Sequence, residues 1–306
     1  MPNIEPELHV ACAVIRQGNQ VLLSQRLASA HQGGLWEFPG GKVAAQESPE
    51  DALARELYEE LGIQVRASRF RFQIPWDYGD RRVRLWVFDV DAFAGLPTGR
   101  EGQVVRWVSL DDVSGYHFPS ANNAIVQTLA LPRIVRFYDP ALGPPNLWLD
   151  AWHVPVLLYF RGVQELDELS QLIDRALSIG HRVILPITQH ALWREGVGLH
   201  RQKGDGRALA EVALERCPGA WPLTAGCRSL DDWRAQADWP AHAWFVSPVL
   251  PTDSHPDLEP LGWAGFRDLA QHLARPCYAL GGVTPGDLDH AIAAGGFGVA
   301  GIRGFQ

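Results

Sequence analysis

The sequence predicts two α/β domains, of which the second is expected to be a (β/α)8 barrel. The chain has 306 residues, about twice the ~150 residues that one domain commonly takes. A segment rich in Pro and Gly, residues 139–146, lies near the middle. After it, short apolar runs alternate with helical segments, as in repeated βα units around a parallel sheet. We therefore expect domains at residues 1–132 and 133–306, with a linker around residues 139–150.

The first half alternates short strands and helices. Apolar runs at residues 9–15 and 20–26 predict two strands separated by a turn, and a Gly-rich loop follows at residues 32–41. Ser48 then predicts a helix N-cap, with Pro49 in the first turn and Asp51 as the acid three residues on. The apolar stripe of this helix is Ala52, Leu53, Leu57 and Leu61, and Gly62 ends it. Residues 81–93 and 104–110 alternate like strands, and residues 122–131 predict a closing helix.

The second half contains eight apolar runs that predict strands. They are residues 133–139, 154–160, 181–187, 196–200, 221–226, 243–250, 277–282 and 297–302. Eight βα units favour a (β/α)8 barrel, although the segment is short for a fold that usually takes ~250 residues. The sequence ends right after the last run, so we expect no eighth helix.

Composition and charge exclude several classes of protein. Hydrophobic residues make up 46% and charged residues 20% of the chain, as in ordinary globular proteins. Residues 1–132 hold 12 basic and 16 acidic side chains and residues 133–306 hold 15 and 19, so neither half predicts a nucleic-acid surface. No apolar stretch reaches ~20 residues, and no secretory signal is evident. Four scattered cysteines without a C-x-x-C pair suit a reducing compartment. We expect a cytoplasmic protein without nucleic-acid or membrane partners.

The predicted helix at residues 49–61 carries a cluster of carboxylates. Glu56, Glu59 and Glu60 stand at i, i+3 and i+4, so they share one helix face. Three like charges do not stabilise a helix, but their oxygens suit a hard divalent cation such as Mg²⁺. Glu47 and Arg55 stand where they could complete or orient the cluster. The alternative is a solvated acidic face.

The wider pattern decides between these two interpretations. It reads Gly41, five residues, Glu47, seven residues, Arg55-Glu56-Leu57, one residue, Glu59-Glu60, one residue, Gly62-Ile63. Such a set of fixed positions arises by chance on the order of 10⁻⁹ times per start point. The pattern resembles a complete Nudix box. The resemblance implies a Nudix hydrolase, an α/β/α sandwich that cleaves nucleoside diphosphates linked to another group with Mg²⁺ or Mn²⁺.

Residues 1–132 resemble the MutT type of Nudix hydrolase, through the segments 35–42, 99–103 and 118–122. The resemblance implies a metal held by the carbonyl of Gly40 and by the carboxylates of Glu56, Glu60 and Glu101. Glu59 or Glu101 would position or deprotonate the attacking water, with Arg55 also in the catalytic set. The resemblance also implies how the substrate is bound. The purine would lie over Leu8 and Val10 with Arg81 above it, and Lys42 would meet the phosphates. The base pocket would be lined by Arg26, His31, Phe38 and Asn122, and the segment 35–42 would add Glu37, Pro39 and Gly40. For Asn122 a helix N-cap, and for Arg26 and His31 a surface role, remain alternatives.

Residues 133–306 resemble the thiamine phosphate synthase and TenI family in the segments 196–200, 224–229, 279–283 and 298–302. The resemblance implies a phosphate site at Gly281, Gly282 and Gly301, although these glycines could simply make tight turns. Three departures argue against synthase activity. Pro186-Ile187-Thr188 stands where the family has an Asn-Asp pair, residues 251–255 end in His255 in place of Lys, and Arg161 alone represents the basic cluster.

Several functions follow, from different classes. The leading one is a Mg²⁺-dependent nucleoside triphosphate pyrophosphohydrolase that converts 8-oxo-dGTP or 8-oxo-GTP to the monophosphate and pyrophosphate, with a degenerate barrel that binds a phosphorylated ligand. One alternative is a Nudix hydrolase for a thiamine-pathway diphosphate. Another is a non-catalytic ligand-sensing or interaction protein, and the complete carboxylate set argues against it. A thiazole tautomerase in the barrel also stays open, because His200 and His255 could move protons.

Overall fold

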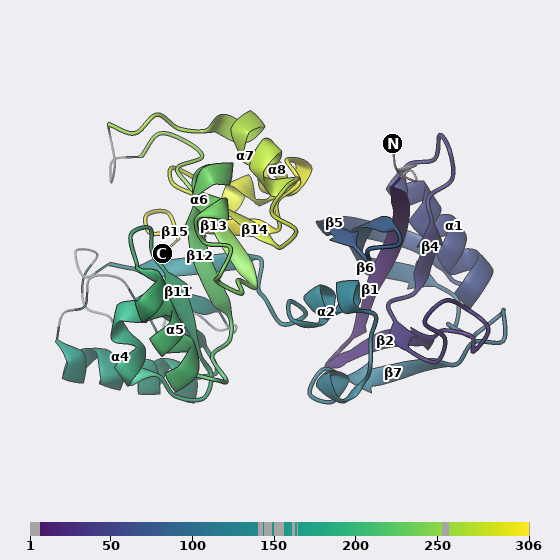
Figure 1. Cartoon of the computed structure of the whole chain (residues 1–306), viewed down its shortest axis with the longest axis horizontal. Helices are drawn as coiled ribbons and strands as arrows, with labels where there is room; N and C mark the ends of the chain where they lie inside the picture. Colours follow the sequence, from purple (N-terminus) through teal and green to yellow (C-terminus); the bar gives the residue numbers. More distant parts are fainter. Residues whose placement is uncertain are drawn as a thin grey trace. The chain divides into compact units, whose positions relative to one another are not determined.

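The computed structural model describes residues 7–139, 143, 149, 156–160, 163, 165–252 and 257–305. The chain divides into two compact units, Met1–Ala130 and Leu131–Gln306, and each is described by itself (Figure 1). No helix among the described residues is long and apolar enough to cross a membrane. Much of the Pro- and Gly-rich segment, including residues 140–142 and 144–148, lies outside the described residues.

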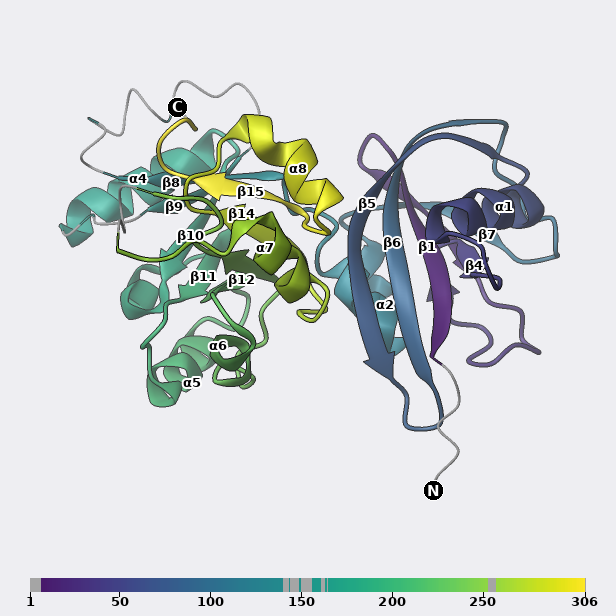
Figure 2. The same ribbon diagram turned by 90° about the horizontal axis from the view of Figure 1, so that it is seen from above.

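The first unit is built on a mixed β-sheet. Its strands are β1 (Leu8–Gln17), β2 (Gln20–Gln25), β3 (Trp36–Glu37), β4 (Gly40–Lys42), β5 (Gln64–Asp77), β6 (Arg82–Ala94) and β7 (Val105–Ser109). The order is β3-β2-β1-β6-β5, with β4 paired to β1 and β7 paired to β2. Only β1 and β6 pair in parallel; the other pairs are antiparallel. Figure 2 shows β5, β6 and β1 side by side.

A helix covers each face of this sheet. On β1, Ala11, Ala13 and Ile15 belong to the apolar cluster that includes Leu53 and Leu57 of α1 (Pro49–Leu61). The alternate residues of β1 belong to a second cluster with α2 (Ser120–Val126). Successive strand residues point to opposite faces, so the two helices lie on opposite sides of the sheet. The predicted α/β/α sandwich is confirmed.

Local signals at the ends of α1 act as predicted. The Ser48 hydroxyl accepts a hydrogen bond from the backbone N–H of Asp51 at 3.1 Å, which satisfies one of the first-turn donors. Gly62 ends the helix in the left-handed region at φ 72°, where glycine has no steric penalty. The four residues of the predicted apolar stripe are all buried.

Three strands and both ends of one helix differ from the prediction. The strand β5 was not predicted, and the short strands β3 and β4 lie inside the expected Gly-rich loop. The closing helix, expected at residues 122–131, begins at Ser120 and ends at Val126. A short 3-10 helix, η1 (Val113–Gly115), precedes it. The sequence of β5 shows no regular alternation of apolar and polar residues, because its pairing with β6 shifts register at three places. Each bulge moves the apolar side chains to the other face of the sheet.

The second unit is a closed barrel of eight parallel strands. They are β8 (Ile134–Tyr138), β9 (Leu157–Phe160), β10 (Arg182–Pro186), β11 (Val197–Arg201), β12 (Leu223–Cys227), β13 (Ala243–Val246), β14 (Cys277–Leu280) and β15 (Gly298–Gly301). The barrel closes where β8 pairs with both β15 and β9. The helices among its described residues are α4 (Leu166–Ser178), η3 (Ile187–Leu192), α5 (Arg207–Arg216), α6 (Leu230–Arg234), α7 (Gly262–Ala270), η4 (Pro285–Asp287) and α8 (Leu288–Ala293). All eight predicted strands are confirmed. Because β8 belongs to the barrel, cutting the chain near Asp139 would remove a barrel strand.

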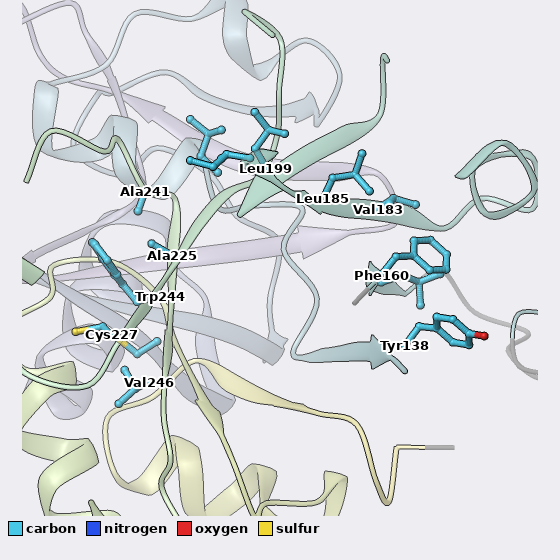
Figure 3. Packing of buried hydrophobic residues seen from close by; sticks show 14 of the residues in the cluster. Tyr138, Phe160, Val183, Leu185, Leu199, Ala225, Cys227, Ala241, Trp244 and Val246 are labelled. Atoms are coloured by element: carbon cyan, nitrogen blue, oxygen red, sulfur yellow. The ribbon is translucent and has the colours of Figure 1, made fainter. Parts of the chain in front are cut away.

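Alternation along the barrel strands separates two apolar clusters. Phe245 of β13 meets Phe137 of β8 and Tyr278 of β14, at ring-centroid distances of 5.2 and 5.4 Å, so these aromatic side chains fill the barrel interior. Trp244 and Val246, the alternate residues of β13, belong to the outer cluster that includes helix residues. Figure 3 shows part of this outer cluster. The barrel therefore has a packed core, and ligands are left to its ends.

Candidate active site

Arg55 organises the carboxylates of α1. Its Nε and Nη2 atoms donate to the two carboxylate oxygens of Glu47, each at 2.9 Å. Its Nη1 donates to Glu56 at 2.9 Å and to Glu59 at 3.0 Å, and Nη2 also donates to the carbonyl of Lys42 at 3.0 Å. The hydrogen bonds that Glu47 accepts from Arg55 and from the backbone N–H of Ala44 lower the pKa of Glu47 to about 2. One planar guanidinium thus holds three carboxylates and the end of β4 in a fixed arrangement.

Glu60 is a half-buried carboxylate near the end of α1. It accepts a hydrogen bond from the backbone N–H of Gly40 at 3.3 Å. Burial raises the pKa of Glu60 to about 8, and the negative charges of Glu37, Glu56 and Glu101 add to the effect. Negative charge from α1, from β3 and from the loop after β6 thus acts on the half-buried carboxylate of Glu60, and this electrostatic environment favours a cation.

Two glycines let β4 lie against this cluster. A Cβ on Gly40, whose φ is 144°, would fall 2.0 Å from the carbonyl oxygen of Ala11. A Cβ on Gly41 would fall 2.2 Å from the carboxyl carbon of Glu56. At Gly40 the obstacle is backbone, so no side chain fits there, whereas a side chain at Gly41 would displace the carboxylate of Glu56. The backbone of β4 itself therefore lies against the carboxylates.

The four expected metal ligands are partly assembled. Gly40 and Glu60 are hydrogen-bonded, Glu56 touches Gly41, and Glu101 is near enough to act on the Glu60 pKa. Within the part of the chain that the structure describes, no group of three or more His, Cys, Asp or Glu side chains converges on one point as a metal site. Arg55 explains this for Glu56, because its guanidinium engages that carboxylate. The oxygen donors suit Mg²⁺ or Mn²⁺, and the assignment of these ligands stays a prediction.

Asn122 lies on the other face of the sheet, within the cluster that includes α2. It is 7% exposed, and its Oδ1 lies 3.5 Å from the backbone N–H of Phe38, at the outer limit for a hydrogen bond. Phe38 stacks on Phe118 with centroids 5.8 Å apart, and Leu8 and Val10 pack against the same cluster. The interpretation of Asn122 as a helix N-cap is wrong, because Pro119 holds that position.

The remaining substrate-binding candidates are scattered over this unit. Arg26 pairs with Glu37 and donates from Nε to the carbonyl of His31 at 2.9 Å, so it is an ordered, half-buried side chain. His31, Lys42 and Arg81 are exposed, and Arg81 contacts its neighbour Asp80 at 3.4 Å. Pro39 is buried, and its carbonyl accepts from the backbone of Ala13 at 2.8 Å.

The barrel carries a cavity of about 880 Å³. Its lining residues follow the carboxyl ends of several strands, where barrel sites form. Gly281, Gly282 and Gly301, the predicted phosphate residues, all line it. Gly281 and Gly282 have φ values of 87° and 69°, so a tight turn accounts for both of them. Sequence reasoning missed Lys203, Arg228 and Asp232, which also line the cavity. No sequence motif links the three residues, because Lys203 follows β11 whereas Arg228 and Asp232 follow β12.

His200 forms part of the cavity floor as a neutral ring. Its Nδ1 lies 3.0 Å from the hydroxyl of Thr224, and its ring lies 5.0 Å from Tyr159 and 5.5 Å from Phe245. Burial lowers the pKa of His200 to about 3, so it does not exchange protons readily near neutral pH. His255 and Arg161 lie outside the described residues.

Comparison with known proteins places both units in families. Residues 10–128 match the NUDIX domain family, and residues 171–305 match the thiamine monophosphate synthase family. The 8-oxo-dGTP diphosphatase of Escherichia coli K12 is 36% identical over 124 residues, which are 40% of this chain and 96% of that protein. The CTP pyrophosphohydrolase of the same organism is 33% identical over 132 residues, 43% of this chain and 98% of that protein. A solved structure of a thiamine phosphate pyrophosphorylase from Pyrococcus furiosus is 18% identical, with a TM-score of 0.45, and the match covers 56% of this chain and 85% of that one.

The matches agree with the two folds and with the box that α1 carries. The first unit has the carboxylates, the arginine and the glycines of the box in contact with one another. The match to the diphosphatase from Escherichia coli covers 96% of that protein with 124 residues of this chain, about the length of the first unit. The chain is a Nudix hydrolase joined to an eight-stranded barrel, of which residues 171–305 match the thiamine monophosphate synthase family.

Proposed function

We propose that the first unit is a nucleoside triphosphate pyrophosphohydrolase that acts on 8-oxo-dGTP or 8-oxo-GTP. The observation that carries the proposal is the arrangement around Arg55 and Glu60, where Glu56 and Glu60 lie against the backbone of β4. The negative charges of Glu37 and Glu101 also act on Glu60. Similarity to an 8-oxo-dGTP diphosphatase supports the substrate class. The negative charge of a polyphosphate repels the electron pair of an attacking water. The residues of this chain must therefore order both the water and the polyphosphate.

In the proposed site, Gly40, Glu56, Glu60 and Glu101 would hold Mg²⁺ or Mn²⁺. The bound ion would neutralise charge that develops on the phosphoryl oxygens. Glu59 is half-exposed, at 51%, so its carboxylate can meet water and accept its proton, with Glu101 as the other candidate base. Lys42 would contact phosphate oxygens. Asn122, buried beside Phe38, offers both a donor and an acceptor to the edge of a base.

The test is pyrophosphate release from a panel of substrates. We expect Mg²⁺-dependent turnover of 8-oxo-dGTP in excess of dGTP, CTP and thiamine diphosphate. The variant Glu60→Gln should lose on the order of 10²-fold in turnover, because it removes one ligand from a site with few ligands. The matched control is Glu195→Gln, an exposed carboxylate in the barrel unit. Near-normal turnover of Glu60→Gln would refute the metal assignment, and a preference for CTP or thiamine diphosphate would refute the substrate.

For the barrel we propose binding of a phosphorylated small molecule at Gly281, Gly282 and Gly301, without thiamine phosphate synthesis. The three glycines line one cavity, and glycine backbone N–H groups can approach phosphate oxygens. A Cβ on Gly282 would fall 2.3 Å from the carbonyl oxygen of Pro251. The variant Gly282→Val should therefore weaken binding of a phosphate monoester in calorimetry, and unchanged affinity would exclude the site. Formation of thiamine phosphate from its two phosphorylated precursors would overturn the second half of this proposal.

A further inference from the structure

The charge of the barrel cavity is opposite to that of its domain. Residues 133–306 hold 15 basic and 19 acidic side chains. Among the described residues that line the cavity, however, three are cationic, Lys203, Arg228 and Arg303, and only Asp232 is acidic. An acidic domain that concentrates cations at one concave surface favours anions there.

Two of the cations form one group. Lys203 follows β11, and Arg228 follows the neighbouring strand β12. Asp232 links them, because its Oδ1 lies 3.0 Å from the Lys203 ammonium and its Oδ2 accepts the backbone N–H of Arg228 at 3.1 Å. The Arg228 guanidinium donates to the carbonyl of Glu259 at 3.0 Å, a neutral acceptor that leaves its charge intact. Asp232 thus pairs with the side chain of Lys203 but with the backbone of Arg228, whose guanidinium donates to Glu259 instead.

This group lies at strand ends other than those of the predicted phosphate site. Gly281 follows β14 and Gly301 ends β15, whereas Lys203 and Arg228 follow β11 and β12. In the closed order of the barrel, β13 separates the two pairs of strands. Both groups line the same cavity, with neutral side chains such as Tyr159 and His200 also in its lining.

We propose that the barrel cavity binds a small molecule with two separate anionic groups, one of them a phosphate. The phosphate meets the glycine turns of β14 and β15, which rests on the barrel site proposed above. The second anion, a phosphate or a carboxylate, meets Lys203 and Arg228. Asp232 pairs with the Lys203 ammonium and binds the backbone of Arg228, and the three side chains together carry a net positive charge. A guanidinium and an ammonium are both suited to either kind of anion.

The test is calorimetry on the full chain in EDTA, with matched probes. The probes are linear diols phosphorylated at both ends, the same diols phosphorylated at one end, and ω-phosphorylated hydroxy acids, each in a series of chain lengths. We expect one chain length at which a doubly anionic probe binds about tenfold tighter than its monophosphate, as two surface ion pairs would give. Comparison of the diphosphorylated and carboxylate series identifies the second anion.

Three variants locate the effect. Lys203→Ala with Arg228→Ala should abolish the tenfold preference and change monophosphate affinity less than about twofold. Asp232→Asn should keep or increase the preference, since it removes the carboxylate and retains an acceptor for the Arg228 N–H. The control pair is Arg207→Ala with Arg234→Ala, two exposed ion-paired arginines that do not line the cavity.

Each outcome bears on one proposal. Equal affinity for single and double anions at every chain length, or a preference that survives in the Lys203 and Arg228 variant, overturns the second anion site. A merely structural role for Asp232 would lower both affinity and melting temperature in Asp232→Asn, which also overturns it. Failure of every monophosphate to bind overturns the phosphate site at the glycine turns instead.

Discussion

Replacement of Arg55 by lysine should slow turnover by the first unit while leaving its fold intact. The guanidinium makes five hydrogen bonds, two to Glu47, one each to Glu56 and Glu59, and one to the carbonyl of Lys42. An ammonium is a single point with three donors, so it cannot reach partners on both sides of the planar fork. We expect Glu56 and Glu59 to lose their fixed positions. The side chains of Glu47, Glu56, Glu59 and Arg55 are between 16% and 51% exposed. Water can therefore solvate the carboxylates that Arg55 releases.

The expected magnitude follows from that geometry. Displacement of a reacting or positioning group by about 1 Å costs on the order of 10²-fold in rate. Arg55→Lys should therefore lower kcat by roughly 10- to 100-fold, with a small change in KM for the nucleotide, because Asn122 and Phe38 on the other face of the sheet are untouched. The assay measures kcat and KM with 8-oxo-dGTP over a range of Mg²⁺ concentrations, together with the melting temperature.

The control for this experiment is Arg69→Lys. Arg69 is an exposed arginine of β5 that holds Asp91 through two hydrogen bonds, at 2.6 and 2.8 Å. It tests the same chemical change at a site away from the box. A kcat for Arg55→Lys within about twofold of the parent would refute the positioning argument, and so would an equal loss in Arg69→Lys.

Two further predictions concern one residue in each unit. Asn122→Ala should bring the activities on 8-oxo-dGTP and dGTP closer together, because an unpaired buried base edge costs ~1–3 kcal/mol; an unchanged ratio would show that Asn122 does not read the base. The folded pKa of His200 lies below its ordinary value of 6.5, at about 3, so its neutral form stabilises the barrel above pH 6.5 and this contribution is lost as pH falls from 6.5 towards 3. The loss is on the order of 5 kcal/mol. His200→Phe should therefore flatten the acid limb of melting temperature against pH, and an unchanged limb would contradict the prediction.

The elements that the sequence predicted well are those with local causes. Ser48, Pro49 and Gly62 determine where α1 begins and ends through contacts within a few residues, and eight apolar barrel runs stand out because parallel strands are buried on both faces. β3 and β4 have two and three residues, and they exist because β2 and β1 offer pairing partners. No pattern within such short segments could have indicated them.

The candidate sites divide in the same way. The carboxylates of α1 share a helix face, so their proximity follows from spacing alone. The contact between Asn122 and Phe38 joins positions 84 apart in the chain, and only the resemblance placed them together. Lys203, Arg228 and Asp232 meet because parallel neighbours β11 and β12 end at the same edge of the barrel. Sequence reasoning could find the strands but not which polar residues beyond their ends would meet.

The two units approach phosphate with opposite electrostatics, and this difference supports one last prediction. The site on α1 gathers carboxylates around Glu60, so it repels a polyphosphate until a divalent cation intervenes. The barrel cavity is lined by Lys203, Arg228 and Arg303 against the one carboxylate of Asp232, among the residues the structure describes, so it attracts anions without a metal. EDTA should therefore abolish nucleotide turnover and leave phosphate-monoester binding to the barrel within about twofold, while salt should weaken the barrel binding by screening. Loss of barrel binding in EDTA would mean that a metal serves both units.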